Sequence, residues 1–546
     1  MPGRKRTQLL VLSALAAVIL LVIAWQFYKY HLVERRLAEA VAAKTKGLYL
    51  LHYENLTFDE AAGMLHVKNI DIRPDTAVYR QMVRENKDPH LLLQIHVDAL
   101  DISRVKTPKA LLTKQLEGGK VEVAGARIRI MVNHFKKDSS VYNPTPDLTK
   151  QLLGKLLKIA IDSVQINDAA VLVGGMDSSE IYFRGNKVSV LLSHLLIDSS
   201  AQKDSSTILF SRDLTLDCKE LALPAGKKKY TIGVDSLRFT STDNTLRVGQ
   251  FSLRPRLSEM AFAASYPVQK DRYDFVLKDI ALHHIDRKEL WAKSIRCDSL
   301  VIAESAFRIY RDMTRPPDTT SKVGKYPQQQ LMHLPFPLTI GKLTFTHSFI
   351  EYKERSAKTH NSGTVQFHNV RASIRNVTNR RADLQKDNRC IVDFHTRFLN
   401  KVPVDARLVM LLKDPKGRFT LKGDFGSLDA PSLNPLTQPM ALARLEKGKI
   451  DHLHFAIRGT DSAGEGKVAL SYRDIKVSLL RQDKDDTGYD KKALASLFAN
   501  FIVKNSSRPD DPGTKEVHFQ RILNKSFFNL VWKTLFTGVK ESVGMK

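Results

Sequence analysis

The chain alternates between apolar and polar residues over most of its length. From about residue 48 to residue 480, segments such as 121–130, 157–166 and 336–345 place an apolar side chain at every second position, and Gly, Asn and Asp separate them. A period of two puts the apolar side chains of a strand on one face. The pattern predicts a mainly β domain over residues 48–481. Helical patterns are few and occur at 76–86 and 146–156.

One strand pattern recurs along this region. Residues 95–102 lead through a short helical pattern to 119–130, and residues 275–282 lead through another, at 288–291, to 295–310. Each copy reads strand, helical turn, strand, strand, and a related fragment follows at 342–352. Repeated β units stack side by side, because each copy covers the apolar face of its neighbour. We therefore expect an elongated, curved, repeat-built and groove-like β-sheet.

The N-terminus carries an uncharged apolar run from Leu9 to Phe27. At about 1.5 Å per residue, a helix over this run spans roughly 28 Å, close to the hydrocarbon core of a bilayer. A cleaved signal peptide is the alternative, but its apolar region is shorter, about 7–15 residues. Bulky Trp25 and Tyr28 also stand where cleavage would occur. The run predicts a transmembrane anchor at 9–30, followed by a juxtamembrane helix at 31–47.

Charge sets the expected orientation and partners. Arg4, Lys5 and Arg6 form a basic tail at 1–8, which favours a cytoplasmic N-terminus and a body outside the cytoplasm. The chain has 85 Lys and Arg against 58 Asp and Glu, a net charge of +27. Such a charge suits an anionic partner. Outside the cytoplasm this partner is expected to be a phospholipid or another anionic envelope lipid rather than nucleic acid.

The residues from 482 to 546 change character. A polar break at 482–489 ends the β pattern, and helical spacing of apolar residues follows at 494–502 and again at 520–539. In the second stretch one helix face can hold Phe528, Val531, Trp532, Leu535, Phe536 and Val539. Such a helix could lie in a membrane interface or could cap the end of the sheet. Two polar segments, 137–147 and 314–329, are predicted to be exposed loops.

Motifs of enzymes and metal sites are missing from the sequence. The three cysteines, Cys218, Cys297 and Cys390, are far apart, and Cys218 and Cys297 are interpreted as buried strand residues. His452 and His454 are close in sequence, but no carboxylate or thiol stands at the spacing of a metal site. Nucleotide-binding, nucleophile and zinc-protease motifs are also missing. We therefore expect no enzyme, cofactor or metal; a carboxylate pair or a Ser/His pair in a cleft would reopen the hydrolase alternative.

Segments near both ends resemble a known family. After the predicted anchor come LHYENLTF at 51–58 and GMLHVKNIDIRPD at 63–75, and near the other end come GKIDHLHFAIRG at 448–459, GKVALSYRDIKV at 466–477 and SFFNLVWK at 526–533. These segments resemble AsmA-like proteins of Bacteroidota envelopes, which belong with TamB- and YhdP-like proteins. The resemblance implies a single-pass inner-membrane protein with a periplasmic body, whose apolar groove handles lipids or assists outer-membrane biogenesis.

A lipid groove needs an apolar lining. The candidate positions lie in the alternating segments and are Val121, Val123, Ile128, Ile130, Leu300, Ile302, Leu343 and Phe345. If no second layer covers them, acyl chains can. If they contact one another in a closed core, the protein is instead a non-catalytic envelope scaffold that binds other envelope proteins through its basic surface. The sequence leaves both alternatives open.

Overall fold

A computed structural model describes most of the chain. The described residues are 38, 41–42, 45–59, 61–89, 91–105, 113–132, 157–176, 180–198, 207, 210–482, 489–491, 506–507 and 513–544. The predicted anchor at 9–30, the helices expected at 146–156 and 494–502, and the loop expected at 137–147 lie outside them. The described residues include no helix that is both long enough and apolar enough to cross a membrane.

The protein is mainly β, as the alternating pattern predicted, and its internal contacts divide it into two units. Unit 1 comprises Met1–Phe251 and His283–Lys293, and unit 2 comprises Ser252–Leu282 and Ser294–Lys546. Each unit contains its own hydrophobic cluster on its own strands.

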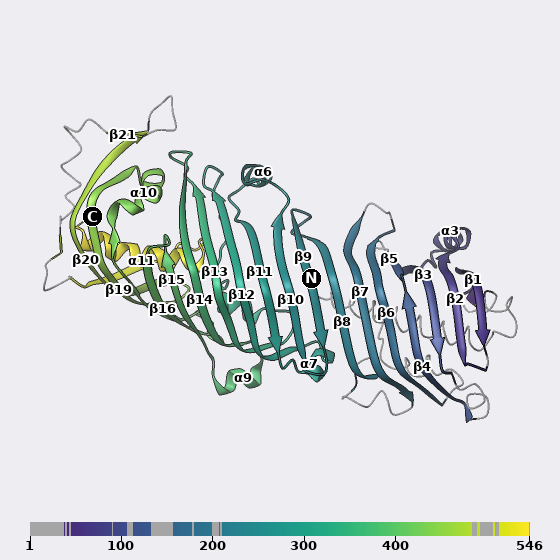
Figure 1. The fold of residues 1–546 in the computed structure, drawn as a ribbon. Helices are drawn as coiled ribbons and strands as arrows, with labels where there is room; N and C mark the ends of the chain where they lie inside the picture. The colour runs from purple at the N-terminus through teal and green to yellow at the C-terminus, as the bar shows by residue number, and fades with distance from the viewer. Residues whose placement is uncertain are drawn as a thin grey trace. The chain divides into compact units, whose positions relative to one another are not determined.

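Within the residues that the structure describes, unit 1 is a run of strands with two short helices (Figure 1). Its elements are β1 (Tyr49–Asp59), β2 (Met64–Pro74), α3 (Thr76–Arg84), β3 (Leu91–Ser103), β4 (Gln115–Ala124), β5 (Arg127–Val132), β6 (Lys158–Gly175), β7 (Ile181–Asp198), β8 (Ser211–Ala225), β9 (Tyr230–Thr240), most of β10 (Thr245–Pro255) and α7 (Arg287–Trp291). Helix α3 confirms the pattern at 76–86. The carboxylate of Asp75 starts it by accepting hydrogen bonds from the backbone N–H groups of Ala77 and Val78.

The pairing in unit 1 is mixed. Strands β1, β2 and β3 are antiparallel, and β3 then pairs with both β4 and β5. Both β4 and β5 run parallel to β6, and β6 to β9 are antiparallel again. Gly125 separates β4 from β5 with a φ of +62°, and a Cβ there would collide with the carboxylate of Asp98. Only glycine suits this position, so the break in the strand is local in origin.

Unit 2 contains the longest strand and most of the helices of the described chain. Its elements are α6 (Glu259–Ala264), β11 (Arg272–His283, whose last residue belongs to unit 1), β12 (Ile295–Asp312), α8 (Pro327–Met332), β13 (Leu338–Arg355), β14 (Ser362–Thr378), α9 (Arg381–Lys386), β15 (Arg389–Phe398), β16 (Val402–Leu411), β17 (Phe419–Phe425), β18 (Leu428–Asp429), the 3₁₀ helix η1 (Ala430–Leu433), α10 (Asn434–Ala441), β19 (Ala443–Gly459), β20 (Ala463–Gln482), β21 (Tyr489–Lys491), β22 (Lys515–Gln520) and α11 (Phe527–Ser542).

The parallel pairs of the two units support the predicted repeat. In unit 2, β12 and β13 are parallel, and antiparallel pairs follow from β13 to β17, then through β19 and β20 to β22. The parallel pair of β12 with β13 corresponds to that of β4 and β5 with β6. The second copy differs in one respect, because β12 is one strand where the pattern predicted two. No glycine breaks β12, and at Ala303 its carbonyl accepts a hydrogen bond from the Thr346 hydroxyl.

Helices cover part of one face of the unit 2 sheet. Helix α11 packs on β19, β20 and β22, and α10 packs on β14 and β19. Figure 1 shows α10 and α11 on the same side of the strands from β14 to β20. We call this side the inner face and the opposite side the outer face. The C-terminal residues also contain the strand β22, which the helical pattern did not predict; it extends the sheet beyond β20.

Candidate functional site

Four of the predicted lining residues lie in one apolar face of unit 1. Val121, Val123, Ile128 and Ile130 are all buried there. The strand register places six apolar residues in one row across β2, β3, β4, β6, β7 and β8, namely Leu65, Ile102, Val121, Val164, Leu192 and Leu214. They belong to one buried cluster. Pairing thus joins separate alternating segments into one continuous apolar face.

The other four predicted residues come together in unit 2. In the parallel register, Leu300 of β12 stands beside Leu343 of β13, and Ile302 stands beside Phe345. Ile302 is buried, whereas Leu300, Leu343 and Phe345 are only partly covered. The parity that the sequence suggested is therefore consistent across this pair of strands. The structure brings together each predicted set within its own unit.

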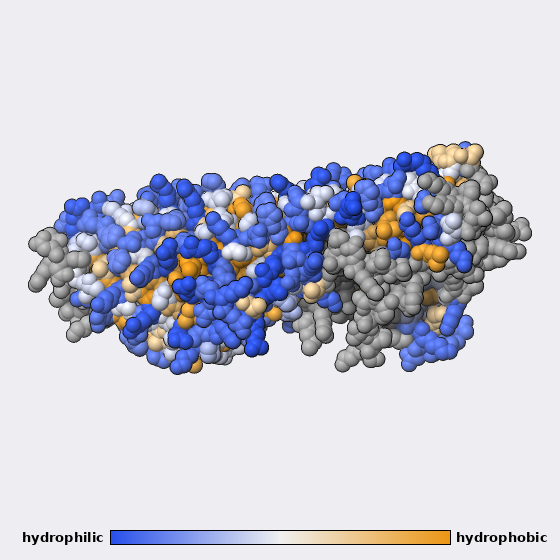
Figure 2. All heavy atoms as spheres, turned by 90° about the horizontal axis from the view of Figure 1, so that it is seen from below, coloured by the Kyte–Doolittle hydropathy of each residue, from blue (hydrophilic) through white to orange (hydrophobic). Residues whose placement is uncertain are grey.

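Aromatic rings extend this apolar surface across unit 2. Phe307 contacts Phe275 and Phe345 with ring centroids 5.3 and 6.0 Å apart, and all three rings are half-buried. Farther along, Phe367 contacts Phe394 and Phe398 at 6.4 and 5.5 Å. We call Phe275, Phe307, Phe345, Phe367 and Phe394 the aromatic strip. Seen from below, unit 2 shows apolar side chains gathered between hydrophilic ones (Figure 2).

Toward β19 and β20 the apolar surface is closed. Phe455 and Val468 are buried there, and so are Leu530 and Thr534, which α11 contributes from above. Gly464 of β20 lies under Thr534, where a Cβ would collide with the hydroxyl. Close approach of helix and strand therefore depends on a residue without a side chain. Unit 2 thus has a filled core at one end and half-covered aromatic rings elsewhere.

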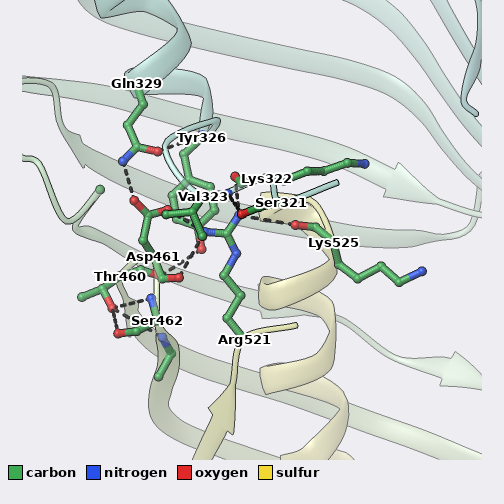
Figure 3. A network of polar contacts seen from close by, with 12 residues as sticks. Ser321, Lys322, Val323, Tyr326, Gln329, Thr460, Asp461, Ser462, Arg521 and Lys525 are labelled. Atoms are coloured by element: carbon green, nitrogen blue, oxygen red, sulfur yellow. Dashed lines mark hydrogen bonds and ion pairs between the residues drawn. The ribbon is translucent and has the colours of Figure 1, made fainter. Parts of the chain in front are cut away.

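A buried arginine fastens α11 to the rest of unit 2 (Figure 3). The Arg521 guanidinium, 1% exposed, donates to the Asp461 carboxylate at 2.6 Å and to the backbone carbonyl of Lys322 at 2.7 Å. It also lies 4.4 Å from the ring centroid of Tyr326. Gln329 donates to the other oxygen of Asp461 at 2.6 Å. Breaking such a buried pair typically costs about 3–5 kcal/mol, so this network is expected to fix the start of α11.

The same network changes the interpretation of residues 314–329, which were predicted to form an exposed loop. Exposed side chains do occur up to Lys325, but Tyr326 is fully buried against Phe419 and Phe527. Gln328 and Gln329 are buried as well. The polar composition of this segment predicted exposure. A glutamine amide can nevertheless be buried, because it can donate a hydrogen bond to a buried carbonyl as water does. The Pro327 start of α8 was the available signal.

The outer face of the sheet is polar and carries ionic groups. On it, Asp424 lies between two histidines, with His454 Nδ1 at 2.8 Å and His452 Nε2 at 3.2 Å. The hydrogen bond with His454 is the largest cause of a lowered pKa of Asp424, and burial opposes it. Asp393 similarly pairs with Arg407 at 2.5 Å and Arg375 at 3.3 Å. Asp393 also lines a depression of this face, together with Thr344, His347, Arg371 and His395.

The described residues contain no metal-binding cluster, and their three thiols are buried. No group of three or more His, Cys, Asp or Glu side chains there has the geometry to hold a metal ion. Cys218 and Cys297 are free and buried, as the sequence suggested, and so is Cys390. Burial raises the pKa of the Cys297 and Cys390 thiols to about 11. Thiols with such pKa values stay protonated near neutral pH and react slowly.

Comparisons with known proteins do not identify the family. No protein-family model matches the sequence, and no curated protein matches it.

Proposed function

We propose that this protein is a membrane-anchored periplasmic protein that handles lipids along its apolar inner face and so assists outer-membrane biogenesis. Support comes from the N-terminal apolar run, the net charge of +27, and the resemblance of segments 51–75 and 448–477 to AsmA-like proteins. The half-covered apolar face of unit 2 suits acyl chains better than polar substrates. The proposal assigns the protein no catalytic step.

The observation that carries the proposal is the half-covered aromatic strip. Phe307 and Phe345 are held edge to face by strand pairing, yet neither is buried. Near them, the buried hydroxyls of Ser305 and Ser348 form a hydrogen bond with each other at 2.5 Å. Neither hydroxyl therefore needs a hydrogen-bond partner from a ligand. Each CH₂ group of an acyl chain that the strip removes from water contributes roughly 0.8 kcal/mol. A surface of this kind binds chains without recognising a particular head group.

Photo-crosslinking in cells tests the proposal on the full chain. The substitution Phe345→p-benzoylphenylalanine places a reactive group in the strip, and Phe307→p-benzoylphenylalanine places a second. We expect lipid adducts at both positions by mass spectrometry. Thr344→p-benzoylphenylalanine is the matched control, because Thr344 precedes Phe345 in β13 and points to the outer face. It should give adducts at background level.

One observation favours a second function. The filled core under α11 and around Tyr326 is what a non-catalytic scaffold with a closed β interior would have. Such a scaffold would bind other envelope proteins through its basic surface. In the crosslinking experiment, protein adducts without lipid at Phe307 and Phe345 would support the scaffold. Lipid adducts that are equally strong at Thr344 would also count against a groove, because they would indicate unspecific contact.

A further inference from the structure

Helix α11 has two apolar sides, and only one faces the sheet. The buried side carries Phe527, Leu530, Thr534, Leu535 and Gly538. On the other side, three large aromatic side chains stand in solvent: Phe528 is 71% exposed, Trp532 50% and Phe536 37%. They recur at every fourth residue, so successive side chains are about 40° apart around the helix axis. Trp532 and Phe536 stack with centroids 5.5 Å apart. We call these three residues the aromatic ridge.

Lysines border the aromatic ridge. Lys533 and Lys540 lie within α11, where helical geometry puts them along one border of the exposed side, and Lys525 lies just before the helix. No carboxylate among the described residues forms an ion pair with any of the three. Glu541 is the single acidic residue of the helix. The exposed side of α11 therefore combines aromatic rings with positive charge that the described part of the fold does not neutralise.

We propose that the aromatic ridge and its lysines dock α11 onto the surface of an anionic lipid bilayer. Tryptophan and phenylalanine partition into the region between head groups and acyl chains, and lysines beside them attract anionic head groups. The opposite side of the helix is fixed to β20 and β22, so docking needs no unfolding of the core. This surface is separate from the aromatic strip, and the proposal stands whether or not the strip binds acyl chains.

The first experiment uses the full chain in nanodiscs of zwitterionic lipid, mixed with separate vesicles that contain phosphatidylglycerol. Wild-type nanodiscs should float with these vesicles. The variant Phe528→Ser/Trp532→Ser/Phe536→Ser should lose on the order of tenfold in vesicle partitioning, because three aromatic side chains no longer enter the interface. The variant Lys525→Gln/Lys533→Gln/Lys540→Gln should lose binding as well and should lose much of its dependence on salt.

A matched control removes exposed apolar side chains elsewhere. Leu157, Met260 and Leu290 are 63%, 63% and 40% exposed, so the variant Leu157→Ser/Met260→Ser/Leu290→Ser makes a comparable change outside α11. It should float like the wild type. Each variant must retain the wild-type melting temperature, which separates loss of docking from loss of folding.

A second readout reports insertion directly. The chain has three tryptophans, so Trp25→Phe/Trp291→Phe leaves Trp532 as the single emitter. Vesicles with brominated acyl chains should quench its fluorescence, and phosphatidylcholine vesicles without anionic lipid should quench it less.

Wild-type nanodiscs that do not float, or an aromatic-ridge variant that floats normally, would overturn the proposal. So would a dimer that this variant converts to a monomer, because the ridge would then be a contact between two copies. Lipid adducts at Phe345 are expected to persist in the variant, which keeps this test independent of the proposed function.

Discussion

At the scale of the residue, the structure explains several charges that the sequence leaves unassigned. Asp414 is 4% exposed at its side chain, although it lies in a polar turn between β16 and β17. Arg418 donates to it from the backbone N–H at 2.7 Å and from two guanidinium nitrogens at 2.9 and 2.6 Å. These hydrogen bonds lower the pKa of Asp414 below its usual value, and those from the Arg418 side chain have the largest effect. Burial of the carboxylate opposes this shift. The aspartate therefore stabilises the turn in its charged form.

The variant Asp414→Asn tests this assignment. A carboxyl whose pKa is lowered by folding contributes stability above its unfolded pKa of about 4, and this contribution is lost as the pH falls through the lower folded pKa. At neutral pH the variant should be less stable by about 1–3 kcal/mol, because hydrogen bonds to a charged acceptor are lost. The difference in unfolding free energy between the variant and the wild type should become smaller below about pH 4. Urea unfolding at several pH values would measure this difference. A difference that stays constant down to the lowest pH would contradict the assignment.

At the scale of the element, α11 shows how one amphipathic pattern can serve two surfaces. The sequence placed Phe528, Trp532 and Phe536 on one apolar face, which could have been the face against the sheet. In the structure the face against the sheet is centred on Leu530 and Thr534 instead. Contact is close, because a Cβ on Gly538 would lie 2.5 Å from the Cβ of Val468. The helix can thus pack tightly while its largest side chains remain exposed.

The variant Gly538→Ala should loosen α11. Alanine favours a helix over glycine by about 1 kcal/mol, but overpacking against Val468 typically costs about 1–3 kcal/mol. We expect a net loss, seen as faster hydrogen exchange of the α11 amides. Thr537→Ala is the control, since its hydroxyl bonds only to the helix carbonyl of Lys533. The additional change Val468→Gly, which removes the Cβ that the alanine would meet, should restore part of the protection in the Gly538→Ala variant. Slower exchange in Gly538→Ala alone would refute the close packing.

At the scale of the whole molecule, charge and the N-terminal apolar run determine where the proposed function can operate. A net charge of +27 suits a body that lies near anionic head groups. Arg4, Lys5 and Arg6 favour a cytoplasmic N-terminus, which would place both units in the periplasm. The lipid-handling proposal requires this orientation, whereas docking of α11 requires only an anionic bilayer.

Reporter fusions to Lys546 test the orientation in a Gram-negative host. Alkaline phosphatase, which is active only outside the cytoplasm, should be active at this position. Green fluorescent protein fused there and exported in unfolded form should be dark. Changing Arg4, Lys5 and Arg6 to Glu should reduce phosphatase activity, because the positive flank that orients the run is lost. A bright green fusion of the wild-type chain would place the body in the cytoplasm and would remove the basis for a periplasmic role.

Several features of the fold were determined by the sequence itself. Alternation at 121–130 and 336–345 specified strands, and it specified that Val121 shares a face with Val123 and Leu343 with Phe345, because a strand has a period of two whatever it pairs with. The spacing of 76–86 and the cap at Asp75 specified α3 for an equally local reason. The repeat was visible for the same cause, since each copy carries its own strand and turn signals.

Only the tertiary structure decided which segments meet. Strand register joined Leu300 to Leu343 and placed Asp424 between His452 and His454, although these residues are far apart in the sequence. The burial of Tyr326 in a polar segment, the pairing of β22 and the choice of the sheet-facing side of α11 were also decided there. Each depends on the free energy of contacts between distant segments. The periodicity of a segment predicts whether it forms a helix or a strand, but it does not predict which other segment will pack against it.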